Sequence, residues 1–81
     1  MADPKDLEAS KAVRRLFTRR GVDTTLADIR CSHGVVTVRG VVAAIRGMDV
    51  EDLRSTVEHL CRALRTRPEI REIVIDVTYR T

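Results

Sequence analysis

Two stretches of alternating apolar and polar residues flank a single glycine, and they constrain the fold more than any other feature of the chain. The first stretch covers residues 26–33 and the second covers residues 35–43. Side chains of a β-strand point alternately to its two faces, so this period of two predicts two strands with one apolar face each. Gly34 between them permits the backbone conformations of a tight turn. The sequence therefore predicts an antiparallel β-hairpin near its centre.

A helix is predicted on each side of this hairpin. Before it, apolar residues recur at helical spacing within residues 4–20, with Pro4 in the first turn and Gly21 just after the end. After it, Asp49 is a favourable N-cap, and apolar residues again repeat at helical spacing within residues 49–66. Each helix should bury one stripe and expose the opposite side.

A further alternating run at residues 70–79 predicts a third strand. Because a helix precedes it, this strand should lie parallel to one strand of the hairpin. Residues 22–25 are expected to be a connection. The element order is then αββαβ, and both helices should cover the one apolar face of the sheet. We expect residues 1–81 to form a single α+β domain, a two-layer sandwich with a three-stranded mixed sheet and two helices on one face.

The hairpin resembles the signature of the BON domain, which is named for bacterial OsmY and nodulation proteins. The resemblance lies in an alternating strand, the turn residue Gly34, the Val-Thr-Val of residues 36–38, and Gly40 followed by a hydrophobic residue. The second helix and the run 70–77 resemble the second half of that family. Residues 68–70 depart from the Gly-Val that BON domains usually carry before the last strand, so the backbone of this turn is expected to differ.

This resemblance implies a non-catalytic binding domain. BON domains are mostly bacterial and often exported, and they are implicated in phospholipid association, osmotic-stress response and, in one cytoplasmic case, potassium binding. The N-terminus of this chain is polar and shows no apolar signal segment, and no stretch approaches the ~20 apolar residues of a membrane span. We therefore expect a cytoplasmic protein without a transmembrane segment.

No arrangement of residues in the sequence indicates catalysis, a cofactor or a metal. There is no nucleophile motif and no glycine-rich phosphate loop. A zinc site is suggested by two Cys–His pairs, Cys31 with His33 and His59 with Cys61. The second pair lies on a predicted helix, where residues two apart differ by about 200° around the axis. If Cys61 belongs to the buried stripe, His59 faces solvent. We expect two buried cysteines that act as small hydrophobic residues, and no catalytic, cofactor or metal site.

The sheet face opposite the helices is where we expect a ligand. The strand alternation places five polar residues there as the candidate binding site: Arg30, Arg39, Arg80, Thr37 and Thr78. Guanidinium groups bind phosphates and carboxylates well. Asp28 and Asp76 fall on the same face, so a cross-strand charge ladder that only keeps the face soluble stays open as an alternative. The arginines of the two helices are interpreted as helix-dipole partners and as a solvated face.

Three functions remain open at this point. The first is a BON-like module that binds an anionic lipid or phosphate surface or a protein partner. The second is a homo-oligomeric interaction domain, because the core of so short a chain is thin and strand edges are exposed. The third, weak binding of nucleic acid through arginine clusters, is the least expected. Bases are usually stacked on aromatic side chains, and Phe17 and Tyr79 are the only aromatic residues.

Overall fold

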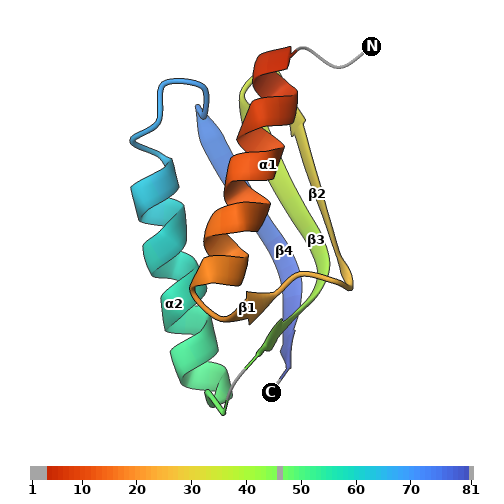
Figure 1. The fold of residues 1–81 in the computed structure, drawn as a ribbon, viewed down its shortest axis with the longest axis vertical. Helices are drawn as coiled ribbons and strands as arrows, with labels where there is room; N and C mark the ends of the chain where they lie inside the picture. Colours follow the sequence, from red (N-terminus) through yellow and green to blue (C-terminus); the bar gives the residue numbers. More distant parts are fainter. Residues whose placement is uncertain (1–3, 46, 81) are drawn as a thin grey trace.

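The computed structural model describes residues 4–45 and 47–80, so residues 1–3, 46 and 81 of the predicted domain lie outside it. Figure 1 shows the helices on the same side of a β-sheet. The elements in chain order are α1 (Pro4–Arg19), β1 (Val22–Asp23), β2 (Ala27–Ser32), β3 (Val35–Ala44), α2 (Val50–Leu64) and β4 (Glu72–Arg80). The predicted α+β class is confirmed.

Strand β3 is the centre of the sheet. Strand β2 pairs with its first part in antiparallel orientation, with Ser32 opposite Val35 and Ala27 opposite Gly40. Strand β4 runs parallel to β3 along its other edge, as the helical crossover predicts. Because β2 and β4 flank the same stretch of β3, side chains of all three strands fall into common rows.

The sheet contains one strand more than the sequence predicts. Val22 and Asp23, expected to be part of a connection, form β1 and pair with Ala44 and Ala43. The backbone N–H of Ile45 extends this pairing by donating to the carbonyl of Gly21 at 2.9 Å. The prediction of three strands was therefore wrong. A strand of two residues has no alternation of its own, so nothing in its local sequence distinguishes it from a loop.

The ends of the other elements differ from the predicted bounds by one or two residues. Strand β4 begins at Glu72 rather than at residue 70, and α2 ends at Leu64 rather than at residue 66. Ile70 is nevertheless only 4% exposed. Its N–H donates to the carbonyl of Arg67 at 3.1 Å, which closes the glycine-free turn before β4. The apolar character of residue 70 thus marked burial in the core and not the start of the strand.

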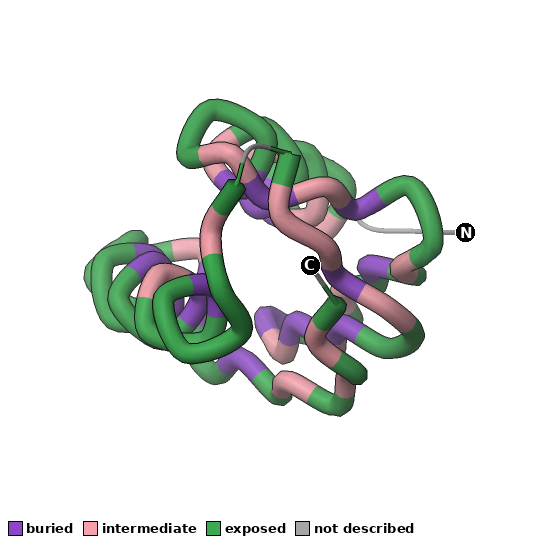
Figure 2. Tube along the Cα trace, turned by 90° about the horizontal axis from the view of Figure 1, so that it is seen from below, coloured by how far each residue is buried: buried purple, intermediate pink, exposed green. Residues whose placement is uncertain are grey.

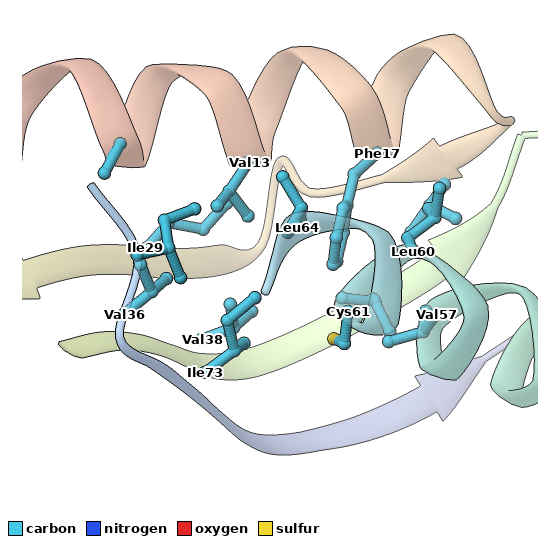
Figure 3. Close-up of a cluster of buried hydrophobic side chains, with 14 of the residues drawn as sticks. Val13, Phe17, Ile29, Val36, Val38, Val57, Leu60, Cys61, Leu64 and Ile73 are labelled. Carbon is cyan, nitrogen blue, oxygen red and sulfur yellow. The ribbon is translucent and has the colours of Figure 1, made fainter. Parts of the chain in front are cut away.

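The hydrophobic core lies between the helices and one face of the sheet. Figure 2 shows the buried segments of the helices and strands facing this interior, and Figure 3 shows their side chains converging on it. The largest fully buried side chains come from α1, α2, β1 and β3: Phe17, Leu53, Leu64, Val13, Val22, Val36, Val38, Val42 and Val57. Burial of each stabilises the fold by roughly 1.5–3 kcal/mol relative to exposure. The core uses every second residue of the strands and leaves the alternate ones to the open face.

Three residues of the hairpin have backbone conformations with positive φ. His33 (φ 53°) and Gly34 (φ 80°) form the two-residue turn, as in a type I′ hairpin. Gly40 has a φ of 112°, and a Cβ atom there would lie 2.5 Å from the carbonyl oxygen of Leu26. A glycine inside a strand often marks the close approach of another segment. At Gly40 that segment is the backbone that enters β2.

Asp6 joins the first turn of α1 to the hairpin turn. Its carboxylate accepts hydrogen bonds from the backbone N–H groups of His33 (3.1 Å) and Gly34 (3.2 Å) and from Sγ of Cys31 (3.4 Å). Desolvation by itself would raise the pKa of Asp6, but these hydrogen bonds outweigh it and hold the pKa below its usual value. The charged carboxylate therefore positions α1 against β2.

Candidate anion-binding surfaces

The open face of the sheet carries the predicted binding residues in rows that the strand register determines. Arg30 lies opposite Thr37. In the adjacent row, Arg39 lies between Asp28 of β2 and Asp76 of β4. The structure thus brings Arg30, Thr37 and Arg39 together, and it adds both aspartates to the same group.

Thr78 and Arg80 lie further along β4. Arg80 is in register with Ala43, which is four residues beyond Arg39 on β3. At about 3.3 Å per residue, roughly 13 Å separates these two rows. Thr78 lies in the row between them, in register with Val41. The five predicted residues are therefore spread over four successive rows of the open face, and they do not converge on one site.

Both arginines of the group are already paired with carboxylates. Nε of Arg30 lies 2.8 Å from Asp28, and Nε of Arg39 lies 3.5 Å from Asp76. Exposed ion pairs of this kind contribute about 0–1 kcal/mol, so their strength would not prevent an anion from binding. The aspartates would nevertheless repel it. This geometry favours the charge-ladder interpretation, and the assignment of these residues to a binding site stays a prediction.

The largest uncompensated charge lies on α1 and just after it. Residues 9–22 contain no acidic residue and five basic ones, which we call the α1 basic face: Lys11, Arg14, Arg15, Arg19 and Arg20. Subtracting these five charges from the net charge of +3 leaves −2 for the rest of the chain. Within residues 4–45 and 47–80, none of the five forms an ion pair. The excess of positive over negative charge therefore lies in residues 9–22, which form the later part of α1 and the residues just after it.

Helical geometry places most of this charge on the side of α1 that faces away from the core. At 100° per residue, the four basic residues within the helix span about 140°, opposite the buried Val13 and Phe17. With Thr18 they line a shallow hollow of about 470 Å³: Lys11, Arg14, Arg15, Thr18 and Arg19. All five of these residues are exposed, so an anion in solution can approach them.

A second hollow, of about 180 Å³, lies between α1 and the end of α2. Its lining includes Arg15 and Arg19 together with Arg67 and Glu8. Because Arg15 and Arg19 line both hollows, the basic surface continues from the outer side of α1 towards α2. The sequence interpretation treated these arginines as a merely solvated face. That interpretation overlooked one signal in the sequence, which is the complete absence of acidic residues from residues 9–22.

The two aromatic residues do not form a platform on which bases can stack. Phe17 is fully buried in the core. Tyr79 is half-buried beside α2, and the guanidinium of Arg54 lies 5.2 Å from the centre of its ring. Stacking is the usual source of affinity for single-stranded nucleic acids. The basic surface therefore offers phosphate contacts without base contacts.

The cysteines lie in surroundings that favour the neutral thiol. Burial raises the pKa of Cys61. Cys31 is half-buried rather than buried as predicted, and desolvation together with the Asp6 carboxylate raises its pKa. In the described part of the chain, no three His, Cys, Asp or Glu side chains are grouped so that they could hold a metal ion. The four residues that suggested zinc are thus not brought together.

Comparisons of the chain with protein-family models, with curated proteins and with solved structures find no match. The BON resemblance accordingly stays an interpretation of the sequence. Neither helix in the described residues is both long and apolar enough to cross a membrane.

Proposed function

We propose that this chain is a small non-catalytic module of the BON type whose α1 basic face binds an anionic phospholipid surface. The observation that supports the proposal most directly is the stretch 9–22, which carries five positive charges, no negative charge and no ion pair among the described residues. The opposite charge balance of the rest of the chain orients the molecule, so that α1 approaches the surface first.

Binding in this arrangement is peripheral and electrostatic. The apolar stripe of α1 contains Ala9, Val13 and Phe17, which are buried in the core and cannot enter the lipid. A basic residue close to an anionic membrane contributes about 1 kcal/mol, so the α1 basic face supplies a few kcal/mol. Salt screens such charges over about 8 Å at physiological ionic strength. The affinity should therefore fall steeply as salt is added.

Lipid headgroups suit this surface better than nucleic acid does. A membrane presents many separate phosphates in a plane, so each exposed arginine of this helix face can contact a phosphate of its own. Single-stranded nucleic acids would need stacking side chains, and Phe17 and Tyr79 are occupied elsewhere.

Vesicle co-sedimentation tests the proposal. The protein is mixed with vesicles of phosphatidylcholine alone or of phosphatidylcholine and phosphatidylserine. A triple variant on α1, Arg14→Gln with Arg15→Gln and Arg19→Gln, should bind the anionic vesicles on the order of 100-fold less tightly at low salt.

The matched control removes the same number of charges from the open sheet face: Arg30→Gln, Arg39→Gln and Arg80→Gln. We expect it to retain most of the binding. The opposite result, with binding lost in the control and kept in the α1 variant, would move the site to the sheet face. Negligible pelleting with both kinds of vesicle would end the lipid proposal, and binding to duplex DNA alone would replace it by nucleic-acid binding.

A further inference from the structure

The outer edge of β4 is a second surface, distinct from the α1 basic face. Among residues 4–45 and 47–80, strand β4 pairs with β3 alone. The N–H of Glu72 points towards β3, since it donates to the carbonyl of Gly34 at 3.3 Å. Backbone groups of a strand alternate between its two edges, so every second residue from Ile73 onward directs its N–H and C=O away from β3. These outward residues are Ile73, Ile75, Val77 and Tyr79.

The first outward position is closed by side chains. The N–H of Ile73 donates to the carboxylate of Glu72 at 3.0 Å, and its carbonyl accepts from Nη2 of Arg65 at 3.4 Å. Glu72 and Arg65 are themselves 3.4 Å apart and form an ion pair. The pair satisfies both backbone groups and blocks the approach of another strand at this point. We call it the edge plug.

Beyond the edge plug the edge of β4 is open. Within the described residues, no side chain bonds to the outward backbone groups of Ile75, Val77 or Tyr79. A hollow of about 350 Å³ lies beside this edge between β4 and α2. Its apolar lining consists of Val57, Cys61, Ile75 and Tyr79, and its rim carries Glu58, Arg62 and Arg65. Unpaired edges are templates for strand addition.

We propose that the open edge of β4 pairs with β4 of a second copy of this chain, in antiparallel orientation about a twofold axis at Val77. The sheet would then continue through both copies. Three outward residues are free, and Val77 is the middle one. In this register Val77 lies opposite the partner's Val77, and Ile75 lies opposite the partner's Tyr79. A register shifted towards the start of β4 would bring the added strand against the edge plug, so the plug selects the axis.

In this register, the side chains on each face of β4 lie next to side chains of the partner's β4 that suit them. On the helix-facing side, the row of Ile75, Val77 and Tyr79 is apolar, and each Tyr79 ring lies next to the hollow of the partner. On the open face, Asp76 comes opposite the partner's Thr78, with the partner's Arg80 as its diagonal neighbour. Diagonal pairs of opposite charge stabilise antiparallel strands. The twofold axis repeats each of these contacts, so each Asp76 has the partner's Arg80 as one diagonal neighbour. Its other diagonal neighbour is the partner's Asp76, and each of these two carboxylates is paired with Arg39 of its own copy.

Analytical ultracentrifugation over a range of protein concentrations tests the proposal. We expect the average molecular mass to rise from that of one chain to that of two in the micromolar to millimolar range. Pairing of one short strand edge buries less than ~1,200 Å², which is typical of weak interfaces. Val77→Lys places two ammonium groups against each other at the axis and should weaken dimerisation by at least about 10-fold. The matched control is Val41→Lys, the same change at a half-buried valine in the central strand.

Hydrogen exchange of the unmodified protein gives an independent reading if the variants do not fold. The amides of Ile75, Val77 and Tyr79 should become protected as the concentration rises, whereas that of Ile73 should be protected throughout by the edge plug. A chain that stays monomeric at millimolar concentration overturns the proposal. A dimer that survives Val77→Lys, or one whose concentration-dependent protection appears on β2 instead of β4, overturns it as well.

Discussion

Gly40 is the residue at which an added side chain would disturb the fold most. Its φ of 112° is unfavourable for any L-residue with a side chain, and a Cβ atom would meet the carbonyl oxygen of Leu26 at 2.5 Å. That neighbour is backbone, which cannot move aside without pulling β2 away from β3. We expect Gly40→Ala to lower the free energy of unfolding by about 2–4 kcal/mol.

Urea denaturation measures this loss, and Gly47→Ala is its control. A Cβ atom at Gly47 meets nothing within 4 Å. The two substitutions have the same chemistry, so the difference between their unfolding midpoints isolates the local geometry. Similar midpoints for both variants would contradict the assigned role of Gly40.

At the level of elements, α2 begins with a complete capping interaction. The side chain of Asp49 accepts a hydrogen bond from the N–H of Asp52 at 2.8 Å, and Glu51 and Asp52 lie in the first turn near the positive end of the helix dipole. Replacement of an N-cap aspartate by alanine typically costs about 1 kcal/mol. We therefore expect Asp49→Ala to destabilise the protein by that amount.

Thermal unfolding followed by circular dichroism checks this expectation. Asp49→Ser keeps an oxygen acceptor and should restore most of the stability. If Asp49→Ala and Asp49→Ser unfold at the same temperature, the hydrogen bond to Asp52 does not contribute and the helix start is stabilised by packing alone.

The elements differ in how well the sequence predicted them. α2 and the hairpin were predicted almost residue by residue, because their periods of 3.6 and 2 are repeated several times within each element. β1 was missed, since its two residues owe their strand conformation to Ala43 and Ala44 some twenty residues later. Ile70 was assigned to the wrong element for a related reason: apolar character reports burial and says nothing about hydrogen-bond pairing.

At the level of the whole molecule, Asp6 connects the start of α1 with a turn that lies far along the chain. Because hydrogen bonds hold its folded-state pKa below the unfolded value of about 3.9, the unfolded chain binds the proton more readily. The contribution of Asp6 to stability is therefore fully present above the unfolded pKa. It is lost as the pH falls through the folded pKa.

The prediction is a pH dependence that Asp6→Asn removes. The free energy of unfolding should be lower in the variant than in the unmodified protein at neutral pH, and the difference should shrink as the pH falls from roughly 5 towards 2. Denaturant titrations at a series of pH values measure both curves. Parallel curves for the two proteins would show that the contacts of Asp6 with His33 and Gly34 do not depend on its charge.

The candidate sites show the same division between local and non-local information. The alternation of the strands correctly indicated that Arg30 and Arg39 leave the core, but only the register shows that Asp28 and Asp76 flank Arg39 in one row and that Arg80 stands apart. The α1 basic face, in contrast, was visible in the sequence as a stretch without acidic residues. Its importance emerged once Arg30 and Arg39 of the sheet were found to be paired with aspartates.

The sequence by itself determined the order and type of the helices and the three longer strands, because hydrophobic periodicity is a local property that each element carries. It also determined the concentration of charge on residues 9–22. Only the tertiary structure decided that β1 is a strand, that the backbone before β2 packs against Gly40, and that the edge of β4 is closed at Ile73. Each of these depends on which segments meet, and strand register brings together residues that no local pattern connects.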